Sequence, residues 1–199
     1  MTGKLTARQK ILDATENLLA TEGLLAVNTN RVADEAQVNI STLYKNFSNK
    51  VDILAELLRT FEIVRTEHIA RWNGTISSQE DWDRWASDTV EAMARFRRER
   101  PAARNLRAAI KVHPELAQVD AESTSAAVEY IIQYLPQPVD SNAQESLISF
   151  LELASQTMSM VLDETSPDTE EGRRRIDALT AFICGGYGTV TKLTSPAVN

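Results

Sequence analysis

The 199-residue chain lacks several features that would each point to a particular class of protein. It has one cysteine, which excludes an internal disulfide and fits a reducing compartment. No apolar run approaches the roughly 18 residues that a membrane span requires, and the first residues lack the apolar core of a secretory signal. We therefore expect a cytoplasmic protein with no membrane partner.

Motifs that carry chemistry are also missing. The only histidines, His68 and His113, are far apart, and no Cys, His or carboxylate spacing forms a metal site. Cys184 has no neighbouring base and lies in an apolar stretch, which favours a buried, inert thiol. Because no segment alternates as a strand does, no glycine-rich phosphate loop or nucleophile elbow can follow one. The sequence predicts no metal, no cofactor and no enzymatic activity.

What is present is typical of a globular protein, with 43% hydrophobic and 25% charged residues. The net charge is −7, but it is unevenly distributed. The first 50 residues hold six basic and five acidic side chains, and the remainder holds 15 basic and 23 acidic ones. This asymmetry has the sign expected for an N-terminal DNA-binding module on an acidic body, although it is modest.

Apolar residues recur at helical spacing throughout, which predicts an all-α fold. Two start signals stand out: Ser77 to Glu80 and Ser141 to Gln144 each have the spacing of a capping box. Pro101 fits a first helical turn, and the proline after His113 ends that helix. The expected helices cover about 5–22, 29–36, 40–47, 50–72, 79–100, 101–112, 116–135, 142–164 and 167–193.

The segment from Asn28 to Lys50, NTNRVADEAQVNISTLYKNFSNK, reads as two short helices joined by a tight turn. This geometry lowers the second helix into the DNA major groove. Leu43 and Phe47 form the buried face of that helix. Tyr44 can donate its hydroxyl to a phosphate, and Thr29 and Lys50 occupy helix ends that favour an anion. The outward residues are Ile40, Ser41, Thr42, Lys45 and Asn46. A helical hairpin with a merely solvated polar face remains the alternative.

The same residues resemble the helix-turn-helix signature of the tetracycline-repressor (TetR) family of bacterial regulators, over about the first 58 residues. VADEAQVNISTLYKNFSNK, Val32 to Lys50, carries the resemblance together with Thr29-Asn30-Arg31. The family usually has Gly at Gln37, where Gln takes a left-handed conformation only with strain. It usually has Ser at Asn39 and often Gly at Ser41. The resemblance implies base-edge contacts from Asn30, Ile40, Ser41, Thr42 and Lys45, and phosphate contacts from Thr29, Tyr44, Asn46 and Lys50.

Aromatic residues form a stripe on the helix that follows Ser77, and it either lines a ligand pocket or packs in the core. The resemblance favours a pocket, because the family binds ligands among its central helices. The candidate ligand-binding residues are Trp85, Thr89, Phe96 and Tyr130. The arginines from Arg95 to Arg100 read instead as a solvated helix end, where cations are favourable for dipole reasons.

The last two helices have the composition of a subunit interface. The first is apolar on two sides, which indicates burial on two sides. The second carries a stripe of small residues. Glycine within a helix is destabilising, and this cost is offset where two helices approach closely. Packing within one subunit is the alternative. The predicted homodimer interface contains Leu147, Leu151, Met158, Ala181, Gly185 and Gly188.

These observations predict a helix-turn-helix DNA-binding domain at residues 1–48 and a helical ligand-binding and dimerisation domain at 49–199. The expected function is a ligand-responsive transcriptional regulator, a repressor that binds palindromic double-stranded operator DNA as a homodimer and is released by a small-molecule effector. Two alternatives remain. One is an activator or a partner-protein-responsive regulator of the same fold, and the other is a helical enzyme or binding protein with a structural N-terminal hairpin.

Overall fold

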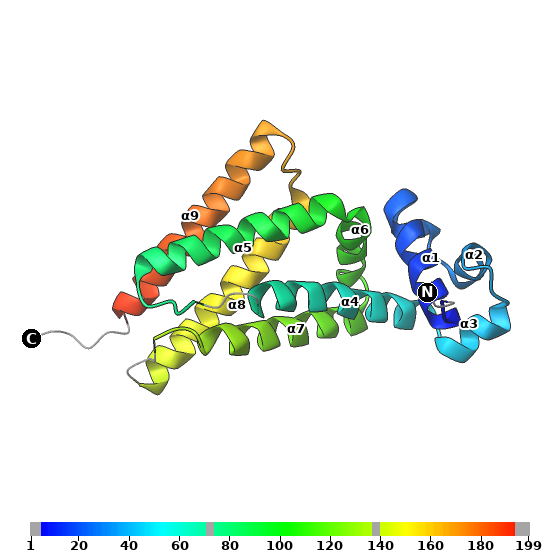
Figure 1. The fold of residues 1–199 in the computed structure, drawn as a ribbon, viewed down its shortest axis with the longest axis horizontal. Helices are drawn as coiled ribbons and strands as arrows, with labels where there is room; N and C mark the ends of the chain where they lie inside the picture. The colour runs from blue at the N-terminus through cyan, green and yellow to red at the C-terminus, as the bar shows by residue number, and fades with distance from the viewer. Residues whose placement is uncertain (1–4, 71–73, 137–139, 194–199) are drawn as a thin grey trace, which may run out of the picture. The chain divides into compact units, whose positions relative to one another are not determined.

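The computed structural model describes residues 5–70, 74–136 and 140–193, and every regular element within these ranges is helical (Figure 1). This confirms the predicted all-α fold. No described helix combines the length and apolarity that crossing a membrane would require. The predicted end of the fourth helix near Trp72 lies outside the described residues. The helices are α1 (Ala7–Thr21), α2 (Thr29–Glu35), α3 (Ile40–Asn46), α4 (Lys50–Ala70), α5 (Gln79–Glu99), α6 (Pro101–Ile110), α7 (Pro114–Ile132), α8 (Ser141–Glu164) and α9 (Glu170–Leu193).

The helices form two compact units. Unit 1 comprises Met1–Val64 and Glu99–Ser123, and unit 2 comprises Arg65–Arg98 and Thr124–Asn199. Helices α4 and α7 therefore contribute residues to both units. The predicted boundary after residue 48 separates a DNA-binding from a ligand-binding function, and it does not coincide with a boundary between the two compact units. The functional division stays a prediction.

Unit 1 is built around α1, which packs against α2, α3 and α6. The apolar spacing of α1 buries Ile11, Leu18 and Leu19 almost completely. The amide of Asn105 on α6 donates a 2.6 Å hydrogen bond to the Leu19 carbonyl near the end of α1. The three short N-terminal helices are thus held on the same core as α6.

Unit 2 has an aromatic core centred on Trp82 of α5. Its indole ring stacks on Tyr187 of α9, with 4.3 Å between the ring centroids. Its Nε1–H donates a 3.2 Å hydrogen bond to the Ile183 carbonyl, so the buried polar atom is satisfied. Phe150 of α8 completes the cluster at 6.1 Å from Trp82. Helices α8 and α9 pack directly against each other in this unit (Figure 1).

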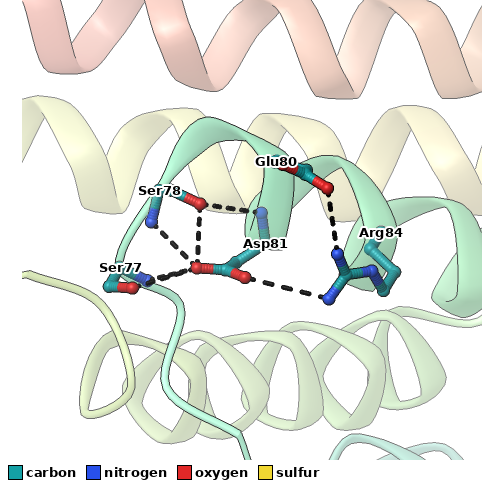
Figure 2. A network of polar contacts seen from close by, with 5 residues as sticks. All are labelled: Ser77, Ser78, Glu80, Asp81 and Arg84. Carbon is teal, nitrogen blue, oxygen red and sulfur yellow. Dashed lines mark hydrogen bonds and ion pairs between the residues drawn. The ribbon is translucent and has the colours of Figure 1, made fainter.

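The cap of α5 lies one residue later than the sequence predicted (Figure 2). Ser78 and Asp81 form the reciprocal box: the Ser78 N–H donates to Asp81 Oδ2, and the Asp81 N–H donates to Ser78 Oγ, each at 3.1 Å. Ser77 also donates to the Asp81 carboxylate, and these hydrogen bonds hold its pKa below the ordinary value. Glu80 instead pairs with Arg84. The predicted partnership of Ser77 with Glu80 was wrong because Asp81 occupies the third helical position.

The caps of the last two helices also differ from the predicted ones, earlier by one residue at α8 and later at α9. Asp140, and not Ser141, caps α8, because its carboxylate accepts a 2.8 Å hydrogen bond from the Ala143 N–H. At α9, Thr169 accepts from the Gly172 N–H at 3.0 Å, so the helix begins after the predicted Ser166-Pro167 start. In each case a good capping side chain stands beside a second candidate, and the position of the first full turn decides between them.

Candidate nucleic-acid interface and ligand cavity

A tight turn joins α2 to α3. Asn28 caps α2 by accepting a 3.0 Å hydrogen bond from the Arg31 N–H. Gln37 then adopts the left-handed conformation, with φ 53°, at the position where strain was predicted. A non-glycine residue in this region costs about 1 kcal/mol, and the surrounding packing must hold it. The turn redirects the chain so that α3 begins at Ile40 against the core of unit 1.

Helix α3 presents one face to the core and the other to the surface. Leu43 is fully buried and Phe47 is 4% exposed, as their spacing predicted. Of the side chains with predicted base-edge contacts, Asn30, Ser41 and Lys45 are exposed and Thr42 is half-buried. Ile40 is an exposed apolar side chain, for which the methyl group of thymine is a suitable partner. The structure leaves this set accessible, and its base contacts stay a prediction.

The side chains with predicted phosphate contacts flank this surface within unit 1. Thr29 Oγ1 and Tyr44 Oη lie 3.2 Å apart, so α2 and α3 bring two hydroxyls together. Lys50 is the first residue of α4, where the helix dipole favours an anion. Asn46 differs, because its amide donates to the Thr42 carbonyl within α3. Backbone N–H groups and hydroxyls at helix ends are groups that position phosphates.

Sequence reasoning missed Arg8, which connects α1 to the end of α3 and to α4. Its Nη1 donates a 2.9 Å hydrogen bond to the Asn46 carbonyl, and its Nη2 lies 2.7 Å from Glu56 Oε2. The guanidinium also lies 4.4 Å from the centroid of the Phe47 ring. A cation at a helix C-terminus is favourable. Because all three partners are distant in sequence, no local signal identifies this residue.

We expect Arg8→Met to disturb the packing of α3 against α1. The hydrogen bond from Arg8 holds the pKa of Glu56 below its ordinary value. The stabilisation that the pair contributes is therefore fully present at pH values above the ordinary pKa of Glu56, and it is lost as the pH falls through the lowered pKa. Arg8→Met should raise the pKa of Glu56 toward its ordinary value and weaken DNA binding, and Arg8→Lys should do both to a smaller extent. Carbon-detected NMR titration of the Glu56 carboxyl measures the first effect. An unchanged Glu56 pKa in Arg8→Met contradicts the assignment.

Unit 2 contains an apolar cavity of about 50 Å³ between α5, α7, α8 and α9. Two of the predicted ligand-binding residues, Trp85 and Thr89, line it. Phe96 and Tyr130 are not among the described residues that line it, and their role in ligand binding stays a prediction. Tyr130 instead shares a 2.7 Å hydrogen bond with Tyr134, one turn along α7 and just beyond its end.

The predicted dimer residues divide into covered and accessible ones. Leu147 and Leu151 are buried in the core of unit 2 within one protomer, and their predicted place in the dimer interface stays a prediction. Met158 also packs against this core, and a Cβ on Gly188 would meet the Gln79 side chain of α5 at 2.5 Å. Ala181 and Gly185 are exposed on α9, and nothing lies within 4 Å of a Cβ placed on Gly185.

Exposed apolar side chains of this unit lie on α8 and α9. Leu153 and Met160, from the second apolar stripe of α8, are each 54% exposed, and Phe182 of α9, which the sequence did not single out, is 48% exposed. The close approach between α8 and α9 uses Gly186, which is outside the predicted small-residue stripe and where a Cβ would lie 2.5 Å from the Phe150 ring. The role of that stripe in a subunit interface stays a prediction.

Cys184 does not offer a reactive thiol. Burial raises the pKa of its thiol, and its Sγ lies 3.8 Å from the Asp83 carbonyl. Thiolate chemistry requires the opposite shift. Within the part of the chain that the structure describes, no group of His, Cys, Asp and Glu side chains is arranged to hold a metal ion.

Comparison with known proteins places both parts of the chain. The family model described as bacterial regulatory proteins, tetR family, matches residues 11–57. The model described as tetracyclin repressor-like, C-terminal domain, matches residues 80–186. No curated protein matches the sequence.

Solved structures share the fold at low sequence identity. A transcriptional regulator from Streptomyces coelicolor A3(2) is 16% identical, with a TM-score of 0.65 over 96% of this chain and 99% of that one. A TetR-family regulator from Streptomyces coelicolor is 21% identical, with a TM-score of 0.65 over 93% and 99%. The multidrug binding protein EbrR, complexed with imidazole, is 17% identical, with a TM-score of 0.60 over 90% and 96%.

Proposed function

Because the chain belongs to the tetR family of bacterial regulatory proteins, we propose that it is a ligand-responsive repressor that binds a palindromic operator as a homodimer and is released by a small-molecule effector. The family and the similar solved structures are those of transcriptional regulators, so the chain is not an enzyme. The alternative in which the N-terminal hairpin is merely structural is thereby removed.

One observation carries the DNA-binding part of the proposal. Helix α3 buries Leu43 and Phe47 completely or nearly so, while Ser41, Tyr44 and Lys45 remain exposed on its other side. A short helix that is anchored on one face and polar on the other is what entry into a major groove requires. The hydroxyls of Thr29 and Tyr44 and the N-terminus of α4 supply groups suited to the flanking phosphates.

Exposed apolar side chains on α8 and α9 support the proposed dimer. Leu153, Met160 and Phe182 are each about half exposed. Exposed apolar patches mark interaction surfaces, and a two-fold interface would place the same residues on both protomers. A two-fold symmetric protein binds a DNA site with the same two-fold symmetry, which is a palindrome. The recognition helices of the two protomers would then be about 34–36 Å apart, or a multiple of this distance.

Release by an effector would be a shift in population. The cavity lies in unit 2, and α4 and α7 run from unit 2 into the unit that holds α3. A ligand that binds one conformation better than the other shifts the equilibrium toward it, and tight binding alone would shift nothing. Thermodynamic linkage requires effector and operator to weaken each other's binding by the same factor. EbrR, which shares the fold, has been solved with imidazole bound.

Substitution of Lys50 tests the phosphate contacts. Lys50→Ala should weaken operator binding and reduce the slope of log affinity against log salt by about 1, because one fewer counterion is released. Tyr44→Phe should weaken binding without changing the slope, because it removes a neutral donor. Fluorescence anisotropy with labelled operator, measured over a range of salt concentrations, gives both quantities.

The matched control is Arg174→Ala, which also removes one positive charge. Arg174 is exposed on α9 in unit 2 and pairs with Glu170 one turn earlier. It should leave both the affinity and the salt slope unchanged. Equal effects of Lys50→Ala and Arg174→Ala would mean that only net charge matters, and the assigned phosphate contact would be rejected.

A further inference from the structure

The cavity of unit 2 is uncharged along its entire described lining. Thirteen residues form its walls, and none is Asp, Glu, Lys, Arg or His. Moving a charged group into such surroundings is costly unless a partner is present. The lining therefore disfavours an anionic or cationic ligand, whatever the net charge of the protein surface.

Two polar side chains on the wall have no hydrogen-bond partner among the described residues. Trp85 is 7% exposed and Thr89 is 6% exposed, and they lie one turn apart on α5. Buried polar groups are normally paired, because an unmade hydrogen bond leaves the full cost of desolvation. In contrast, Trp82 on the same helix donates its N–H to the Ile183 carbonyl.

Thr89 lacks a hydrogen bond that several helical threonines of this chain make. Thr15 donates to the Ile11 carbonyl and Thr180 donates to the Ile176 carbonyl, each four residues earlier. Thr89 makes no such bond. Among the described residues, only Thr165 Oγ1 is both fully enclosed and unpaired. The polar atoms of Trp85 and Thr89 are therefore not fully enclosed, and both residues line the cavity.

The chemistry of these groups selects an acceptor. An indole N–H only donates, and a threonine hydroxyl can donate to whatever fills the cavity. A cation held on an aromatic face is disfavoured, because Trp82 is already stacked on Tyr187 at 4.3 Å and lies 5.1 Å from Trp85. Ser155 on the facing α8 adds a second hydroxyl to the wall.

The size of the cavity indicates that binding must move its walls. An apolar cavity of about 150 Å³ holds benzene, whereas this one measures about 50 Å³. Met158, an unbranched and adaptable side chain, lines it and is only half-buried. A ligand of single-ring size would thus favour an expanded conformation, which is the differential binding that regulation needs.

We propose that the effector is a small, uncharged, largely apolar molecule that presents a hydrogen-bond acceptor to Trp85 and Thr89. This inference rests on the proposed function, because it names the class of ligand that acts at the regulatory cavity. It excludes carboxylates and ammonium compounds of the same size.

Four probes of matched shape test it: ethylbenzene, acetophenone, benzoate and benzylammonium, titrated to millimolar concentration by calorimetry. Acetophenone should bind roughly 2- to 10-fold more tightly than ethylbenzene, since it adds one accepted hydrogen bond. Benzoate and benzylammonium should bind at least tenfold more weakly than acetophenone. Equal or tighter binding of either ion, or no binding of any probe, overturns the proposal.

Two variants assign the preference to its residues. Thr89→Val keeps the shape of the wall, and Trp85→Phe keeps an aromatic ring but enlarges the cavity. Each variant removes one donor, so each should reduce the preference for acetophenone over ethylbenzene while ethylbenzene still binds. Ser87→Ala removes an exposed hydroxyl from the same helix and should change neither. An acetophenone preference that survives both variants contradicts the assignment, and retained ethylbenzene binding shows that the variants are folded.

The failure of this inference can be told from the failure of the proposed function. Operator binding without any probe depends on α3 and not on the cavity. If the protein binds operator DNA but no neutral probe, the DNA-binding function stands and the ligand class is wrong. If it binds no operator DNA, the proposed function is wrong whatever the probes show.

Discussion

Replacing Arg107 with methionine should lower the free energy of unfolding by about 3–5 kcal/mol, because it removes a cation that two poorly hydrated carboxylates contact. Arg107 of α6 reaches Asp120 at 2.9 and 3.4 Å through its two terminal nitrogens, and its Nη1 lies 3.6 Å from Glu62 Oε1. The side chains of Arg107 and Glu62 are only 12% and 11% exposed.

This cluster ties three helices of unit 1 together: Glu62 lies on α4, Arg107 on α6 and Asp120 on α7. Ser123 also donates a 3.0 Å hydrogen bond to Glu62. Loss of the arginine therefore affects α6, which packs against α1, and α1 in turn packs against α2 and α3. Urea denaturation followed by circular dichroism gives the change in unfolding free energy.

The control for Arg107 is Arg174→Met. Arg174 and Glu170 are 71% and 78% exposed, and such surface pairs contribute about 0–1 kcal/mol. A second variant, Glu62→Gln in the Arg107→Met background, should recover part of the lost stability, because it removes one of the two carboxylate charges that Arg107 contacts. Similar costs for Arg107→Met and Arg174→Met would show that the cluster does not stabilise unit 1 as argued.

Phe182→Glu should dissociate the homodimer and weaken operator binding by about 10²–10⁴-fold, because a monomer engages one half-site without the benefit of linkage. Phe182 is 48% exposed on α9, one turn from Gly185, beside which there is open space. A glutamate here would place like charges across a two-fold interface and remove apolar area from it.

Light scattering after size exclusion measures the dissociation. The measured mass should fall from that of a dimer, twice the 22.1 kDa mass of the chain, to that of a single chain. Val112→Glu is the control: Val112 is 66% exposed in the connection after α6, and its loss should leave the dimer intact. A Phe182→Glu protein that remains dimeric and folded would exclude this face as the interface.

The sequence predicted helices α2 and α3 well because the capping residues and apolar spacing that define them are local. The four-residue spacing of Leu43 and Phe47 indicated the buried face of α3. The strained position of Gln37 was predicted from the family resemblance, because the family usually has Gly there. The caps of α5 and α8 were displaced by one residue, because Ser78 and Asp140 stand beside equally good capping residues.

Long-range geometry could not be read in this way. The periodicity of α8 showed two apolar stripes, but it did not indicate which one the protomer covers, and Leu151 proved internal while Leu153 is exposed. The rotation of α5 and α7 placed Thr89 at the cavity and Tyr130 outside its described lining. Arg8 joins residues from three helices, so its role depends on the tertiary fold alone.

The most direct test of the account is selection of double-stranded DNA on the purified protein at near-physiological salt, starting from fragments of the parent genome and followed by sequencing of the retained DNA. We expect a palindromic consensus whose half-sites are spaced by about one helical turn or a multiple. Retention of DNA without a shared sequence, or of a single unsymmetrical site, would contradict a dimeric reader built on α3.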